Sequence, residues 1–128
     1  MIKKFEQYIT EQKSNDIFIY HGTSKGAALN IQRYGFMKPS DTGDEYPSIS
    51  FTNDLRYAEY YAKAKGGSSK MVILRTKLND NFKISNKIRD NKGAEYVSFK
   101  EIPISELEIL SKNNTWKPLD NWDIIFDE

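Results

Sequence analysis

The sequence contains no cysteine, and His21 is its only histidine. Without thiols, disulfides and thiolate zinc sites are excluded, and a single imidazole is too few for a histidine-rich metal centre. We therefore expect no metal cofactor. A chain without cysteine is also compatible with a reducing compartment.

Long apolar runs and an excess of charge of one sign are missing as well. No apolar run approaches the roughly 20 residues that a membrane-spanning helix needs, and the first residues lack the apolar core of a signal peptide. These absences predict no membrane association and a cytoplasmic location. The 19 Lys and Arg and the 18 Asp and Glu leave a formal charge of +1. This net charge gives no argument for nucleic-acid binding, and a local basic patch is the alternative that stays open.

The composition is that of one globular domain. At 38% hydrophobic and 29% charged residues, the 128-residue chain suits a single core, and neither a repeat nor a linker divides residues 1–128. Residues 1–14 have an amphipathic pattern, with Ile2, Phe5 and Ile9 near one face, which predicts an N-terminal helix packed on the domain. Partner binding by this helix is the alternative. We expect a monomer, although the oligomeric state cannot be derived from sequence.

Periodicity and capping residues predict the order of the elements. Ser24 and Gly35 bound a helix over residues 25–34, and Asn53 caps a second helix over residues 54–65. Residues 79–93 are polar and predict a loop. The strands are expected at residues 16–20, 48–52, 71–78, 95–99 and 104–110, with a last one within 113–128. Early helices followed by antiparallel strands predict the α+β class.

Residues 20–23, Tyr-His-Gly-Thr, stand at a predicted junction between a strand and a helix. A lone histidine beside a strand is often structural, and that alternative stays open. The other candidates further along the chain suit cleavage of the N-glycosidic bond of NAD. Its oxocarbenium-like transition state needs a carboxylate near the ribose, such as Glu95, and its leaving nicotinamide needs an aromatic ring, such as Tyr61.

The order and spacing of these residues resemble the ADP-ribosyltransferase fold, in the branch of diphtheria toxin and the poly(ADP-ribose) polymerases. That branch is marked by a His, Tyr, Glu signature. The resemblance spans about residues 17–110. Three motifs carry it. The first is residues 20–23, followed by residues 31–32 and 38–39. The second is residues 51–61, and the third is residues 95–97.

The resemblance implies a fold, a substrate and a set of roles. The fold is a split antiparallel β-sheet core with flanking short helices, and NAD is a substrate that binds without a metal. His21 would bind the adenosine ribose, the backbone of Gly22 would hold the carboxamide, and Tyr61 would stack on nicotinamide. Glu95 would be catalytic. Thr23 and Ser50 complete the expected NAD-binding residues.

Two departures from the family pattern affect these expectations. The position of the first stacking tyrosine is Ser50, so Phe36, Tyr46 or another aromatic residue would have to close the pocket. Residues 48–50, Ser-Ile-Ser, are similar to the serine motif of the arginine-modifying branch, which carries a second glutamate two residues before the catalytic one. Gly93 occupies that place, so arginine modification is not expected.

The resemblance therefore implies a NAD-dependent mono-ADP-ribosyltransferase that modifies a macromolecule, either protein or nucleic acid. A toxin-like protein, a phage effector and a housekeeping enzyme are all compatible with this activity. Two alternatives remain. One is a NAD glycohydrolase, in which water replaces the acceptor, and the other is a non-catalytic binding module of the same fold.

Overall fold

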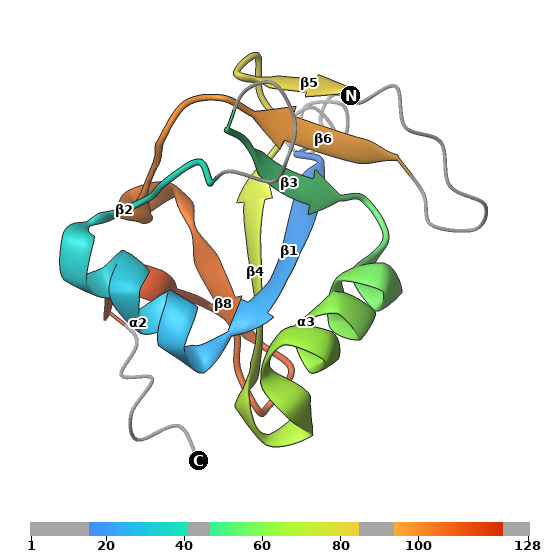
Figure 1. Cartoon of the computed structure of the whole chain (residues 1–128), viewed down its shortest axis with the longest axis vertical. Helices are drawn as coiled ribbons and strands as arrows, with labels where there is room; N and C mark the ends of the chain where they lie inside the picture. Colours follow the sequence, from blue (N-terminus) through green and yellow to red (C-terminus); the bar gives the residue numbers. More distant parts are fainter. Residues whose placement is uncertain (1–15, 41–46, 85–93, 122–128) are drawn as a thin grey trace, which may run out of the picture.

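The protein is a mixed α+β structure built mainly on an antiparallel sheet (Figure 1), as the order of predicted elements indicates. This computed structural model describes residues 16–40, 47–84 and 94–121. The predicted N-terminal helix over residues 1–14 and the end of the tail, residues 122–128, lie outside the described residues. No helix in the described ranges is long and apolar enough to cross a bilayer.

Seven strands form the main sheet in the order β5-β6-β3-β1-β4-β8-β9, and every neighbouring pair is antiparallel. A second sheet pairs β2 with β7. The elements are β1 (Phe18–Ser24), α2 (Lys25–Tyr34), β2 (Phe36–Met37), β3 (Ile49–Thr52), α3 (Leu55–Lys70), β4 (Met71–Lys77), β5 (Phe82–Ile84), β6 (Glu95–Ser98), β7 (Ile102–Pro103), β8 (Glu108–Leu110) and β9 (Trp116–Pro118), with 3₁₀ helices at Ile104–Glu106 and Leu119–Asn121.

The central strand β1 is longer than its sequence suggests and contains the Tyr-His-Gly-Thr motif. Its register with β4 runs from Phe18 opposite Lys77 to Ser24 opposite Met71, so the backbone stays extended past the apolar run at residues 17–19. The motif was predicted at the end of the strand and lies inside it instead. All of β1 pairs with β4, whereas its pairing with β3 is limited to Tyr20 opposite Thr52.

Helix α2 begins and ends where its capping residues predict. The Ser24 hydroxyl accepts a hydrogen bond from the Ala27 N–H, and Gly35 adopts φ 87° and donates its N–H to the Ile31 carbonyl. Ala28 and Ile31 face the core. Tyr34, in the last turn of the helix, is 64% exposed.

Helix α3 is capped by Asp54, not by Asn53 as predicted. The Asp54 carboxylate accepts the Arg56 N–H at 3.0 Å. Asn53 instead makes two bonds to Ala94, donating its N–H to the Ala94 carbonyl at 3.2 Å and accepting the Ala94 N–H on its side chain at 2.9 Å. The start of α3 is thereby tied to the residue that precedes β6.

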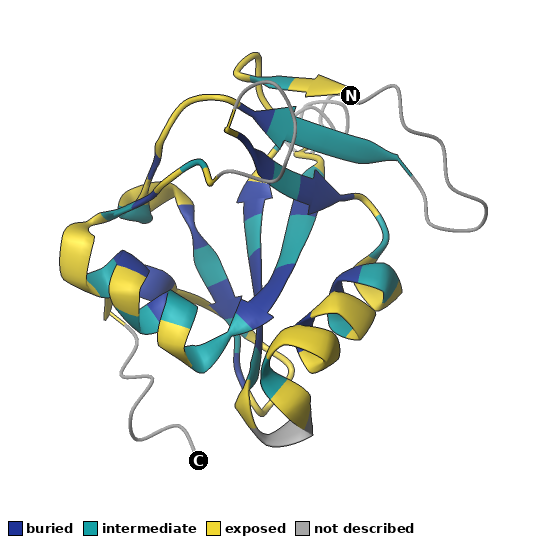
Figure 2. Ribbon diagram, viewed as in Figure 1, coloured by how far each residue is buried: buried dark blue, intermediate teal, exposed yellow. Residues whose placement is uncertain are grey.

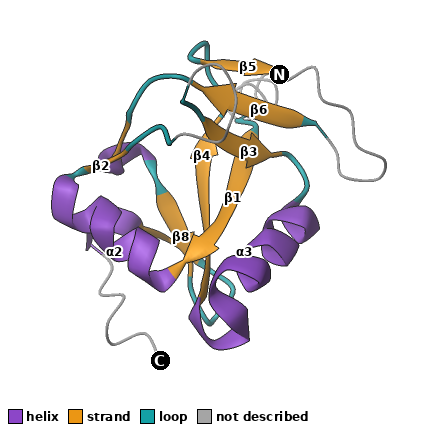
Figure 3. Ribbon diagram, in the orientation of Figure 1, coloured by secondary structure: helices purple, strands orange, loops and turns teal. Residues whose placement is uncertain are grey.

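The two helices lie on opposite sides of β1 and β4 (Figure 3), and these strands are mostly buried or half-buried whereas the helices carry many exposed residues (Figure 2). Ile19 of β1 and Leu74 of β4 belong to a core cluster with Ala28 and Ile31 of α2. Ile73, the neighbour of Leu74 along the chain, packs with Ala58 and Ala62 of α3 in a second cluster. Successive side chains of a strand point to opposite faces, so α2 and α3 sandwich β1 and β4.

Three segments differ from their predicted secondary structure, because pairing between residues far apart in the sequence determines it. The strand β5 forms within the predicted loop at residues 79–93, where Phe82 packs edge-on against Phe51 with ring centroids 5.4 Å apart. The strand expected over residues 104–110 divides into a 3₁₀ helix and β8. In the tail, the described part of the predicted strand is β9.

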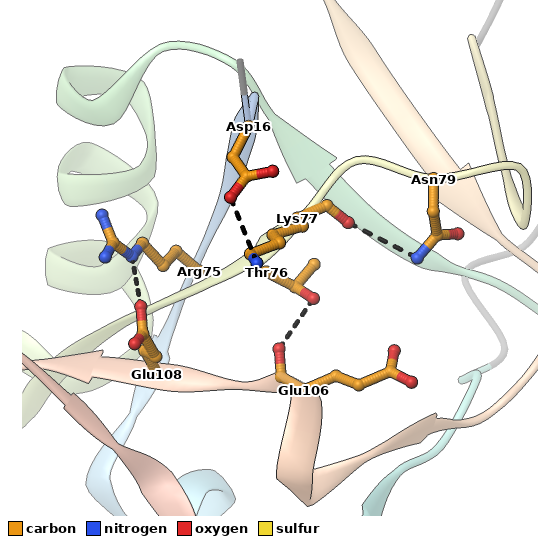
Figure 4. Close-up of polar contacts among 7 residues, drawn as sticks. All are labelled: Asp16, Arg75, Thr76, Lys77, Asn79, Glu106 and Glu108. Atoms are coloured by element: carbon orange, nitrogen blue, oxygen red, sulfur yellow. Dashed lines mark hydrogen bonds and ion pairs between the residues drawn. The ribbon is translucent and has the colours of Figure 1, made fainter. Parts of the chain in front are cut away.

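Polar contacts join β4 to the far edge of the sheet, away from β3 and β6 (Figure 4). The Arg75 Nε donates to the Glu108 carboxylate at 2.6 Å, and the guanidinium lies over the rings of Phe18 and Trp116 at 3.8 and 4.4 Å. The Thr76 hydroxyl donates to the Glu106 carbonyl at 2.8 Å. These contacts bind Glu106 and Glu108 into the β4–β8 region.

Candidate functional site

A cavity of about 510 Å³ opens between the two helices, β3 and the start of β6. Its volume lies within the roughly 300–1,000 Å³ that small-molecule sites occupy. Residues from β1, α2, β2, β3, α3 and the start of β6 line it. The six residues predicted to bind or cleave NAD are all among them, namely His21, Gly22, Thr23, Ser50, Tyr61 and Glu95.

Glu95 is positioned by the register of β3 against β6. Thr52 lies opposite Glu95 in the ladder, and two residues earlier on β3 the Ser50 hydroxyl donates a hydrogen bond to Glu95 Oε2 at 2.8 Å. The carboxylate thus stands on a strand and is oriented by a second strand, which fixes its position far better than a loop would.

Other glutamates near the end of the chain do not reach this cavity. Glu101 and Glu106 are exposed, and Glu108 pairs with Arg75 across the β4–β8 edge. Glu95 is the glutamate that lines the cavity among the residues that the structure describes. Of these four glutamates, the one that lines the cavity is therefore the one that belongs to the sequence motif.

His21 is held by the backbone of β3. Its Nδ1 lies 2.7 Å from the Ser50 carbonyl oxygen, and its ring contacts Phe51 at a centroid distance of 5.4 Å. A carbonyl only accepts hydrogen bonds, so Nδ1 carries the proton and donates, and Nε2 of the neutral ring keeps its lone pair. His21 can accordingly accept a hydrogen bond from a ligand hydroxyl.

Burial keeps this histidine neutral. The pKa of His21 falls from 6.5 to about 4, chiefly because burial separates the imidazolium from water, while the hydrogen bond to Ser50 opposes the shift and the positive charge of Lys65 adds to it. At neutral pH His21 is therefore a hydrogen-bonding group without charge. This state suits ribose binding and does not suit proton donation.

The lowered pKa predicts how acid affects stability. Between about 4 and 6.5 the unfolded chain binds a proton that the folded chain does not, so stability from neutral His21 is present above 6.5 and is lost as the pH falls toward 4. Thermal unfolding followed at several pH values should show a steeper loss for the wild type than for His21→Gln in this window. Equal slopes for the two proteins would contradict a neutral histidine with a lowered pKa.

Gly22 allows helix α3 to lie directly against β1. A Cβ built on Gly22 would stand 1.9 Å from the Ala58 carbonyl oxygen and 2.7 Å from the Ala62 nitrogen. Both atoms belong to the backbone, so the helix can come this close only to a residue without a side chain. The glycine thus has a packing role, in addition to the ligand contact predicted for its backbone. It brings the helix that carries Tyr61 against the strand that carries His21.

Two tyrosines on successive turns of α3 line the cavity. The ring centroids of Tyr57 and Tyr61 are 5.1 Å apart with planes tilted by 51°, and Lys65 Nζ lies 5.5 Å from the Tyr61 ring. Phe36 is not among the lining residues, and Tyr46 lies outside the described residues. Tyr57 therefore adds a second aromatic ring of α3 to the lining of the cavity.

Several residues that contribute to this site have no role predicted from the sequence. Tyr57 was detectable, because its spacing of four from Tyr61 places both on one helix face. Lys38 belongs to the first motif but had no role of its own, and Lys65 carried no such signal; both line the cavity as cations. The Asn53–Ala94 pair, which ties α3 to the start of β6, could not be seen in sequence because its partners are 41 residues apart.

The remaining polar lining is hydroxyl-rich. Thr23, 5% exposed, and Ser48, also 5% exposed, both line the cavity. In the described ranges no group of three or more His, Cys, Asp and Glu residues is arranged to hold a metal ion. The cavity thus offers hydroxyls, one imidazole, one carboxylate, two lysines and three phenol rings to a ligand. Comparisons of the chain with protein-family models, with curated proteins and with solved structures find no match.

Proposed function

We propose that this protein has the ADP-ribosyltransferase fold and is a NAD-dependent transferase that moves ADP-ribose to a macromolecular acceptor. The main support is convergence on one cavity. His21, Ser50, Tyr61 and Glu95 come from four different elements, and they were singled out by motif order alone, yet all four line the same space. Their chemistry matches what cleavage of the nicotinamide–ribose bond requires.

In the proposed reaction, the bond between ribose C1′ and the nicotinamide nitrogen breaks, and its electron pair neutralises the pyridinium ring. The positive charge that develops on the ribose is stabilised by the Glu95 carboxylate, which Ser50 orients. An acceptor oxygen or nitrogen then bonds to C1′ and loses its proton to solvent or to Glu95. Because the carboxylate is already oriented, little reorganisation accompanies the transition state.

The aromatic rings and the histidine bind the two ends of the dinucleotide in this proposal. Tyr61, with Tyr57 packed against it, stacks on the nicotinamide before and after cleavage. His21 accepts a hydrogen bond from a ribose hydroxyl through Nε2, as its tautomer allows. Lys38 adds positive charge near the diphosphate, which NAD carries between its two nucleosides.

Ligand binding provides the first test. Titration calorimetry should detect NAD binding by the wild type, similar binding by Tyr61→Phe, and strongly reduced binding by Tyr61→Ala, because phenylalanine keeps the stacking face and alanine removes it. Tyr34→Ala is the matched control, since Tyr34 is exposed on α2 and does not line the cavity. No binding by the wild type at millimolar NAD, or equal binding by all four proteins, would count against the site.

Products distinguish the transferase from its nearest alternatives. With NAD labelled on the adenosine and a host lysate, the transferase places label on a macromolecule. A glycohydrolase releases only free ADP-ribose, with or without lysate. A binding module leaves NAD intact in both incubations, although it can still bind it.

A further inference from the structure

The aromatic surface of α3 continues from the cavity to the outside of the protein. Tyr57 and Tyr61 line the cavity, whereas Tyr60 does not and is 65% exposed. The Tyr60 ring is nearly parallel to that of Tyr57, with centroids 6.2 Å apart and planes at 10°, and it lies 6.5 Å from the ring of Tyr61. We call these three residues the tyrosine stripe. It leads from the proposed reaction centre to solvent.

Positive charge flanks the tyrosine stripe. Arg56 and Lys65 are exposed near its two ends on α3, and neither forms an ion pair within the described part of the chain. Lys63 is also exposed and lies 3.9 Å from Glu59, so the one acidic residue in this turn is already paired. Lys38, which directly follows β2, adds a cation to the lining of the cavity. The chain as a whole has a charge of only +1, so this concentration of cations is local.

Exposed aromatic rings beside exposed cations are the features that bind single-stranded nucleic acid. Bases stack on the aromatic rings, and phosphates lie near the cations. A duplex presents its phosphates but hides its base faces, so it would use the cations without the rings. A protein partner would need a broader apolar centre than these residues provide, since Leu55, 39% exposed, is the aliphatic residue exposed beside them on the first turn.

We propose that the tyrosine stripe is the acceptor platform and that the acceptor is a single-stranded nucleic acid, with one base stacked on Tyr60 and its phosphates beside Arg56 and Lys65. This proposal rests on the proposed function for its catalytic meaning. In that reaction a base nitrogen or a sugar hydroxyl of the strand would bond to ribose C1′ as nicotinamide leaves. The binding step itself needs no NAD.

Fluorescence anisotropy with a labelled single strand of about 12 nucleotides, in the absence of NAD, tests the platform. Stacking contributes about 1–3 kcal/mol per base, so Tyr60→Ala should weaken binding roughly five- to 150-fold while Tyr60→Phe stays near the wild type. Tyr34→Ala is the control, because Tyr34 is 64% exposed, almost the same as Tyr60, and lies on the other helix. Unfolding temperatures of the variants verify that each one is folded.

Two further probes decide between kinds of polyanion. The same sequence as a duplex, and an acidic polyglutamate peptide, should bind more weakly than the single strand and should be insensitive to Tyr60→Ala. Arg56→Gln should weaken single-strand binding and reduce its salt dependence, since each phosphate contact contributes about 0.7 to the slope for a single strand. A duplex or peptide that binds as tightly as the single strand would overturn the proposal.

The outcome of the oligonucleotide-binding experiment can be distinguished from that of the NAD-binding experiment. A wild type that binds NAD in the calorimeter but no oligonucleotide refutes the platform and leaves the NAD site standing. A wild type that binds the oligonucleotide through Tyr60 but no NAD keeps the platform and refutes the NAD site. Equal losses in Tyr60→Ala and Tyr34→Ala would also refute the platform, because then any exposed tyrosine would serve.

Discussion

Glu95→Gln should fold, bind NAD with nearly wild-type affinity, and release nicotinamide on the order of 100- to 1,000-fold more slowly. This range corresponds to loss of one preorganised charge in the transition state, about 3 kcal/mol. The amide oxygen of glutamine can still accept the hydrogen bond that Ser50 donates to the Glu95 carboxylate. The substitution therefore removes the charge and keeps the geometry. Turnover and affinity measured on the same preparation give the comparison.

Three glutamate-to-glutamine variants are the controls for this experiment. Glu101→Gln and Glu106→Gln alter exposed side chains and should stay close to the wild type in nicotinamide release. Glu108→Gln removes the negative charge that pairs with Arg75 between β8 and β4, so its effect should fall on stability. A Glu95→Gln protein that keeps its activity while one of these loses it would show that the motif has been aligned to the wrong carboxylate.

Gly22→Ala should be the most destabilising glycine-to-alanine substitution among the described residues. The added methyl group would meet the backbone of Ala58 at 1.9 Å and of Ala62 at 2.7 Å, and backbone cannot move aside as a side chain can. Overpacking of this kind costs about 3 kcal/mol or more, which lowers the unfolding temperature of a domain of this size by roughly 10 °C. Thermal unfolding followed by circular dichroism measures it.

Gly26→Ala is the matched control for that variant. Gly26 lies in helix α2, and a Cβ built on it meets nothing within 4 Å. Alanine is favoured over glycine in a helix by about 0.5–1 kcal/mol, so this variant should be as stable as the wild type or more stable. If Gly22→Ala were as stable as Gly26→Ala, the close packing of α3 on β1 would be wrong.

Local signals predicted the elements whose ends are set by neighbouring residues. Helix α2 begins at Ser24's cap and ends at Gly35 because both act through hydrogen bonds to residues a few positions away. The length of β1 was not predictable in this way. Its strand continues through His21 and Gly22 because β4, some 50 residues later, pairs with them. The short strand β5 likewise depends on β6.

The candidate site was predictable in its residue types and not in its contacts. Motif order picked out His21, Ser50, Tyr61 and Glu95, which share one cavity. The hydrogen bond from Ser50 to Glu95 depends on the register between β3 and β6, which no local pattern fixes. The sequence predicted Ser50 as a NAD-binding residue and as the loss of a stacking ring. The structure gives it a polar contact of its own and puts Tyr57 beside Tyr61.

Nicotinamide release from NAD by the purified wild-type protein tests the central proposal most directly. We predict more than one molecule of nicotinamide per protein molecule, with release that is faster when an acceptor is supplied and is nearly abolished in Glu95→Gln. Chromatography of the reaction at millimolar NAD measures it. Release that Glu95→Gln retains in full, or a wild type that binds NAD and yields no nicotinamide with or without acceptor, would contradict the proposed chemistry.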